Sequence, residues 1–123
     1  MVSSMYDLSD TAEAIQALIE VAAPGVPIYW TAARVPATPP SKFVVIEPLF
    51  LNVNQSWGVN THARHTVQVR ACATTIGDAT GLAASILAAL PATQYELAMA
   101  GAPVKVGDHF DMLLTPRTHA TGA

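Results

Sequence analysis

The sequence predicts an α+β fold: two helices packed on a mainly antiparallel sheet of about four strands. Two segments, 9–21 and 76–90, carry apolar residues at the 3–4 spacing of amphipathic helices. Between them, β-prone segments at 42–51 and 66–73 flank a polar stretch, as in a hairpin. The expected order is helix, three strands, helix, and one or two closing strands.

The chain has the length of a single domain, and its charge is unusually sparse. It has 123 residues, of which 12% are charged and 51% are hydrophobic. Soluble domains typically carry ~25% charged residues. So few charges cannot coat the whole surface, which predicts that part of it is covered by other protein. A neutral surface rich in alanine and threonine is the alternative.

Composition also excludes several classes of protein. The net charge is -3 and no run of Lys or Arg occurs, which argues against a dedicated nucleic-acid binder. A single cysteine, Cys72, excludes internal disulfides and zinc sites built from several cysteines. We expect no signal peptide and no membrane span, because no basic segment precedes an apolar one and no apolar run approaches ~20 residues.

The first helix and the strands that follow it are bounded by proline and glycine. Asp7 or Ser9 can cap the helix, and Pro24-Gly25 ends it. The segment 28–31 is a short β-prone run, and three prolines make 34–41 an extended or turning connection.

The next strand, 42–47, is apolar on both faces, so we place it centrally in the sheet. At Pro48 the pairing is interrupted, or the strand continues as an edge through 49–51. The polar segment 52–62 is a long hairpin arm or a loop, with Trp57 near its middle.

The second strand-to-helix unit has the clearest pattern. Val67, Val69 and Ala71 share one face of the strand, and Thr66, Gln68, Arg70 and Cys72 share the other. Thr75 and Asp78 fit a capping box at the start of the helix, which stops at Pro91. The buried stripe is predicted at Ile76, Ala79, Leu82, Ala83, Ile86, Leu87 and Leu90. The opposite side holds Thr80, Gly81, Ala84, Ser85, Ala88 and Ala89, small residues that suit contact with another subunit.

The C-terminal part predicts two short strands, 104–106 and 109–114, about the Gly107-Asp108 turn. From about Pro116 the sequence predicts a polar tail that frays in isolation.

A search for catalytic and metal-binding patterns predicts neither kind of site. No nucleotide-binding, zinc-protease or nucleophile-elbow motif occurs. His62 and His65 would point to opposite faces of a strand, so solvated or interfacial histidines are the better interpretation. Glu47 beside Arg70 would form an ordinary cross-strand pair. We therefore expect no catalytic residue, metal or cofactor.

One passage, His65-Thr-Val-Gln-Val-Arg-Ala-Cys-Ala-Thr-Thr-Ile-Gly-Asp-Ala-Thr-Gly-Leu-Ala, carries a family resemblance. Together with the order of elements over residues 6–115, it resembles the tail terminator (tail completion) proteins of long-tailed bacteriophages. In that family a strand of the V-Q-V kind leads through a short polar turn into a helix rich in Ala and Leu.

The resemblance implies a virion structural protein and no enzymatic activity. Such a protein is assembled in the host cytoplasm into a ring, typically hexameric, at the head–tail junction. It caps the tail tube protein and offers a surface to the head-side connector or stopper. DNA passes through the lumen without specific binding, which a mild acidic balance favours.

Contact surfaces and three rival functions complete the expectations. Interfaces are expected on the arm and on the small-residue side of the second helix, at Gln55, Trp57, His62, Ala84 and Ala88. The nearest rival is another neck protein, a head–tail connector or stopper. A small α+β metal-binding or enzymatic domain that uses the histidine region is a rival of another class, and a cellular scaffold also fits the composition.

Overall fold

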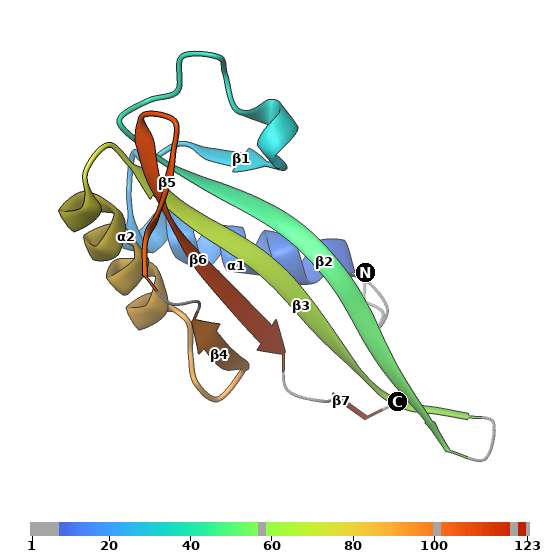
Figure 1. The fold of residues 1–123 in the computed structure, drawn as a ribbon. Helices are drawn as coiled ribbons and strands as arrows, with labels where there is room; N and C mark the ends of the chain where they lie inside the picture. The colour runs from blue at the N-terminus through green and yellow to red at the C-terminus, as the bar shows by residue number, and fades with distance from the viewer. Residues whose placement is uncertain (1–7, 57–58, 100–101, 119–120, 123) are drawn as a thin grey trace.

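A computed structural model describes residues 8–56, 59–99, 102–118 and 121–122. Two helices, α1 (Leu8–Ala22) and α2 (Ile76–Ala89), lie side by side on one face of a sheet (Figure 1). Five of the six strand pairings in this part of the chain are antiparallel. The predicted α+β class, with two helices on a mainly antiparallel sheet, is confirmed.

The sheet contains more strands than the sequence predicts. Its central order is β1-β2-β3-β6-β4, while β5 pairs with β6 and β7 pairs with β3. The extra strands are short, and they become strands by pairing with β3 or β6, which local sequence patterns do not reveal. The prediction of about four strands was therefore too low for the seven that are described. Their bounds are β1 Ile28–Trp30, β2 Lys42–Ser56, β3 Val59–Ala73, β4 Tyr95–Met99, β5 Val104–Val106, β6 His109–Thr118 and β7 Thr121–Gly122.

The parallel pair joins β1 to β2, with Ile28 opposite Val44. Between them the chain turns at Thr31, whose φ of 70° is unusual for a β-branched residue, into the 3-10 turn Ala32–Arg34. The predicted proline-rich connection then leads back to β2. Because β1 covers one edge of β2 at residues 44–46 and β3 covers the other, the prediction of a central strand is confirmed there.

The main core lies between the helices and the sheet. From α1 it takes Ile15 and Ile19, and from α2 it takes Ala79, Leu82 and Ile86. These side chains meet the inward residues of the strands, among them Val44, Ile46, Val67, Val69, Ala71 and Leu114, all fully buried. The predicted alternation of β3 is thus confirmed, and Cys72 belongs to a separate apolar cluster.

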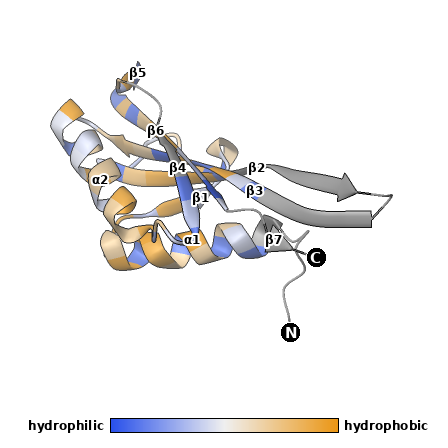
Figure 2. Cartoon of the chain, turned by 90° about the horizontal axis from the view of Figure 1, so that it is seen from below, coloured by the Kyte–Doolittle hydropathy of each residue, from blue (hydrophilic) through white to orange (hydrophobic). Residues whose placement is uncertain are grey.

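The predicted start of α2 is also confirmed, with one correction to its buried stripe. The backbone N–H of Asp78 donates to Oγ1 of Thr75 over 3.1 Å, as a capping residue requires. Ile76, which the spacing places in the stripe, is instead 52% exposed. It is the first residue of the helix, directly after the capping residue Thr75. Figure 2 colours α2 almost entirely apolar or neutral, whereas α1 alternates apolar and polar residues.

A long hairpin arm is formed by β2 and β3, which pair from Lys42 opposite Ala73 to Ser56 opposite Val59. Register shifts occur after Pro48 and after Asn54. Pro48 lies beyond the end of β1, so β2 continues as an edge strand there, where proline is tolerated. The outer half of this hairpin extends past the helices (Figure 1). Of the two predictions for 52–62, the hairpin arm is confirmed for the described residues 52–56 and 59–62.

The predicted polar tail from about residue 116 was wrong for its first part. Strand β6 continues to Thr118, and Pro116 is fully buried. Residues 116–118 pair with Tyr95–Leu97 of β4. Polar composition suggested a tail, but an adjacent strand supplies the backbone partners that order this segment.

Candidate functional site

The sheet face opposite the helices carries a small apolar cluster of its own. Phe43 and Val45 on β2 and Cys72 on β3 are buried there, and Tyr29 and Val35 pack against them. Their position follows from strand alternation, because their neighbours Val44 and Ala71 point to the helix side. A central strand that is apolar on both faces therefore supplies two cores, of which this one is only partly covered.

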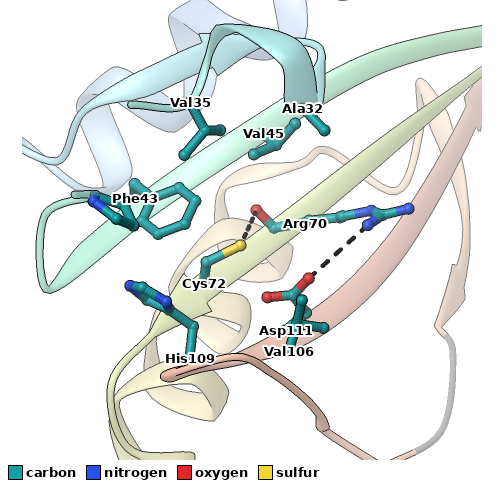
Figure 3. Close-up of a pocket in the computed structure, with 10 residues that line it drawn as sticks. Ala32, Val35, Phe43, Val45, Arg70, Cys72, Val106, His109 and Asp111 are labelled. Atoms are coloured by element: carbon teal, nitrogen blue, oxygen red, sulfur yellow. Dashed lines mark hydrogen bonds and ion pairs between the residues drawn. The ribbon is translucent and has the colours of Figure 1, made fainter. Parts of the chain in front are cut away.

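A hollow of about 230 Å³ opens onto this cluster (Figure 3). We call it the open-face hollow. Its floor is made by β2 and β3, one wall by the connection after β1, and the other wall by β5 and β6. The lining residues are Ala32, Val35, Pro39, Phe43, Val45, Arg70, Cys72, Val106, His109 and Asp111.

The two charged residues in the open-face hollow pair with each other. Arg70 Nη1 lies 3.8 Å from Asp111 Oδ2 across β3 and β6. The two strands bring them together, since Cys72 is the residue directly opposite Asp111. The predicted pairing of Glu47 with Arg70 was wrong. In the observed register Val45 faces Arg70 and Glu47 faces Gln68, so Asp111 is the acidic partner.

The ring of His109 contacts an aromatic side chain and contains a buried nitrogen. It meets the ring of Phe43 edge-on, with centroids 5.2 Å apart. Its Nε2 is buried, and the part of the chain that the structure describes gives it no hydrogen-bond partner. A buried polar atom in this condition lowers stability by about 1–3 kcal/mol relative to a paired one. Phe43 also contacts Tyr29 edge-on at 6.0 Å, so the aromatic wall is continuous.

Cys72, His109 and Asp111 line one hollow, which raises the question of thiol chemistry. Burial and the nearby carboxylate of Asp111 raise the pKa of the Cys72 thiol far above its ordinary value. The thiol is therefore protonated at neutral pH, and the thiolate is the reactive form. Among the described residues, no group of three or more His, Cys, Asp or Glu side chains is placed to hold a metal ion.

Four of the five predicted interface residues are described by the structure, and they fall in two separate regions. Gln55 and His62 lie on the arm, where Gln55 faces Asn60 and His62 faces Asn54. Trp57 lies outside the described residues. Ala84 and Ala88 are on α2 and are exposed. The predicted sites therefore divide between the arm and the outer side of α2.

The outer side of α2 borders a second hollow, of about 260 Å³, between the two helices and the start of β2. Gly77, Gly81 and Ser85 line it on the α2 side. Lys42 Nζ and Asp78 Oδ1, 4.0 Å apart, also line it, and both side chains are about half exposed. Ala84 and Ala88 are not part of this lining.

His65 differs from its predicted role as a solvated or interfacial histidine. It is 7% exposed, and its Nδ1 shares a hydrogen bond with the hydroxyl of Thr11 on α1. Its backbone N–H donates to Oγ1 of Thr118 over 2.9 Å. The prediction was wrong because the polar context of this residue concealed an inward position on β3. His65 joins α1, β3 and β6.

Sequence reasoning missed the open-face hollow. Its residues come from five segments between Ala32 and Asp111, and their proximity depends on strand order. Two signals were present in the sequence: the apolar outward residues Phe43 and Val45, and the apolar side chains of Val104 and Val106. Both valines on β5 are more than half exposed.

Comparison with known proteins shows the fold. No family model and no curated protein matches the chain. Among solved structures, a protein that carries no descriptive name superposes with a TM-score of 0.61 and 18% sequence identity. The alignment covers 95% of this chain and 96% of that chain, so the two share one fold over nearly their whole length. Within the described residues, no helix is both long and apolar enough to cross a membrane.

Proposed function

We propose that this chain is a virion structural protein, a tail terminator of long-tailed bacteriophages. It forms a ring, expected to be hexameric, that caps the tail tube and joins it to the head-side connector. The proposal rests on the resemblance of the His65–Ala83 passage and of the order of elements, both of which lie within the described fold. The work of such a subunit is binding, with no reaction.

The observation that carries this proposal is the projecting β2–β3 arm beside a partly uncovered sheet face. A closed ring of identical subunits needs two different surfaces on each copy, one for each neighbour. The arm and the open-face hollow are two such surfaces on different parts of the molecule. A charged fraction of 12% supports the same interpretation, because surfaces buried between subunits need few charges.

The chemistry of the open-face hollow also favours binding over catalysis. Its thiol is held protonated, and its arginine is paired with its aspartate. The net charge of -3 suits a ring through which DNA passes without being retained. The proposed location is the neck of the virion, with assembly in the host cytoplasm.

Tail tubes polymerised from the tube protein of the same genome provide the test. Electron microscopy with and without the purified chain should show a ring at one end of each tube and arrested growth. Light scattering should give the mass of the ring in solution or in the tube-bound fraction. A chain that leaves the length distribution of the tubes unchanged and binds no tube end contradicts the proposal. Binding to a portal-side complex instead would assign it to the connector or stopper class.

A further inference from the structure

We propose that the open-face hollow receives the β2–β3 arm of a second copy of this chain, so that neighbouring subunits join head to tail. This inference rests on the proposed ring and names the two surfaces that build it.

The arm of a subunit cannot fill its own hollow. The hollow lies near the base of the hairpin, where Val45 faces Arg70, and the paired strands run on to Ser56 and Val59. Eleven residues separate Val45 from Ser56, which is about 36 Å along a strand at ~3.3 Å per residue. Figure 1 shows the hairpin running away from the end of the sheet that carries β1 and β5. An arm in the hollow must therefore come from another copy.

The electrostatic character of the two surfaces matches. The charges of Arg70 and Asp111 offset each other, and the remaining lining is apolar apart from His109 and Cys72. The arm sequence from 48 to 63 contains no Asp, Glu, Lys or Arg. A neutral segment enters a neutral hollow without burying an unpaired charge, which would otherwise oppose association.

The composition of the arm also suits the unpaired nitrogen of the histidine. Among the described residues of a single chain, no group forms a hydrogen bond with the buried Nε2 of His109. The arm carries four side-chain amides, at Asn52, Asn54, Gln55 and Asn60. An amide both donates and accepts hydrogen bonds, so it can serve either tautomer of the imidazole.

An exposed valine at the rim of the hollow would contact the bound arm, so a substitution there tests the proposal. Val106 on β5 lines the hollow and is 52% exposed. Val104, two residues earlier on the same strand, is 60% exposed and is not part of the lining. A glutamate at position 106 would place an unpaired charge against the arm, whereas one at position 104 would remain in solvent. V104E is therefore a closely matched control for V106E.

A second variant removes the outer end of the arm and leaves the hollow intact. Asn54 and His62 face each other, so residues 55–61 can be replaced by Asn-Gly, a two-residue turn that closes such a hairpin. The V106E variant then keeps an intact arm, and the arm-shortened variant keeps an intact hollow. Sedimentation velocity would give the mass of each species, and thermal unfolding would confirm that each variant is folded.

The expected results depend on the head-to-tail geometry. The V104E variant should assemble like the wild type, in solution or on tail tubes, while V106E and the arm-shortened variant should each weaken self-association at least tenfold. A mixture of V106E with the arm-shortened variant should give a heterodimer, because one intact arm and one intact hollow remain between them. A heterologous contact makes this prediction, whereas a two-fold symmetric contact does not.

The failures of the two proposals are distinguishable. If V106E and the arm-shortened variant form rings as readily as V104E, the arm-to-hollow contact is wrong and the ring function stands. If the wild-type chain is monomeric both in solution and in the presence of tubes, both proposals are wrong.

Discussion

Arg117 on β6 donates a hydrogen bond from Nη2 to Oε2 of Glu96 on β4, over 2.8 Å. The two residues are directly opposite in the register, next to the fully buried Pro116. Their side chains are 42% and 34% exposed, so Arg117→Ala should lower the free energy of unfolding by at most about 1 kcal/mol. Ending the chain after Thr115 should cost more than about 2 kcal/mol, because it removes buried side-chain and backbone contacts of β6 with β4. Urea unfolding of both variants measures the difference.

A chain ended after Thr118 is the control for that truncation, since it keeps the pairing of β6 with β4 complete. It loses the short β7 pairing with β3, at His62 and Ala63. If ending the chain at Thr115 and at Thr118 lowers stability equally, residues 116–118 contribute nothing to the free energy of unfolding. Their pairing with β4 would then be unimportant for stability.

The hydroxyl of Thr75 caps α2, so its removal should be measurable. Thr75→Ala leaves the N–H of Asp78 without its 3.1 Å acceptor, at a cost of about 1 kcal/mol. Thr74→Ala is the neighbouring control: Thr74 is exposed, and its backbone bond to Ser41 O is retained in the variant. Equal melting temperatures for the two variants would show that the cap does not stabilise the helix.

Two isoleucines of α2 should respond very differently to the same change. Ile86 is fully buried between helix and sheet, so Ile86→Ala should cost about 2–5 kcal/mol by leaving a cavity. Ile76→Ala, at a position that is 52% exposed, should cost less than about 1 kcal/mol. Denaturant midpoints give both values. A loss at Ile76 as large as the loss at Ile86 would contradict the placement of the helix.

The raised pKa of the Cys72 thiol predicts that the protein loses stability in alkaline solution. Burial and Asp111 raise its pKa in the folded chain, so above the ordinary thiol pKa, about 8.5, the unfolded chain loses the proton and the folded chain keeps it. The proton-linked stability is complete below that pH and decreases as pH rises, by at most about 1.4 kcal/mol per unit. Cys72→Ala should remove this part of the slope between pH 8.5 and 10. An unchanged slope would show that the thiol titrates alike in both states.

Local patterns predicted the parts of the fold that depend on neighbouring residues. The cap at Thr75, the end of α1 before Gly25 and the alternation of Val67, Val69 and Ala71 each follow from interactions within one element. The side chains that pair across neighbouring strands could not be predicted from such local patterns. Arg70 has Asp111 as its partner, 41 positions away, because β6 lies beside β3.

The candidate site was predicted in part for the same reason. The arm was visible as a polar interruption between two β-prone segments, and the exposed small residues Ala84 and Ala88 were visible from helical spacing. The open-face hollow was not, because it exists only after β2, β3, β5, β6 and the connection that follows β1 meet. His65 shows the converse case, since a residue in a polar context became buried by packing against α1.

The outer side of α2 offers the remaining predicted interface, and it can be tested apart from the hollow. Ala84 and Ala88 are exposed, so glutamate at both positions should change the free energy of unfolding by less than about 1 kcal/mol. In a ring that buries this side, two new charges would be desolvated, and assembly on tail tubes should weaken at least tenfold. The double variant A84E/A88E should be compared with Val21→Glu on α1, where the native side chain is 82% exposed. Assembly equal to that of the α1 variant would show that the small side chains of α2 face solvent in the ring, which leaves the arm and the hollow as its contact surfaces.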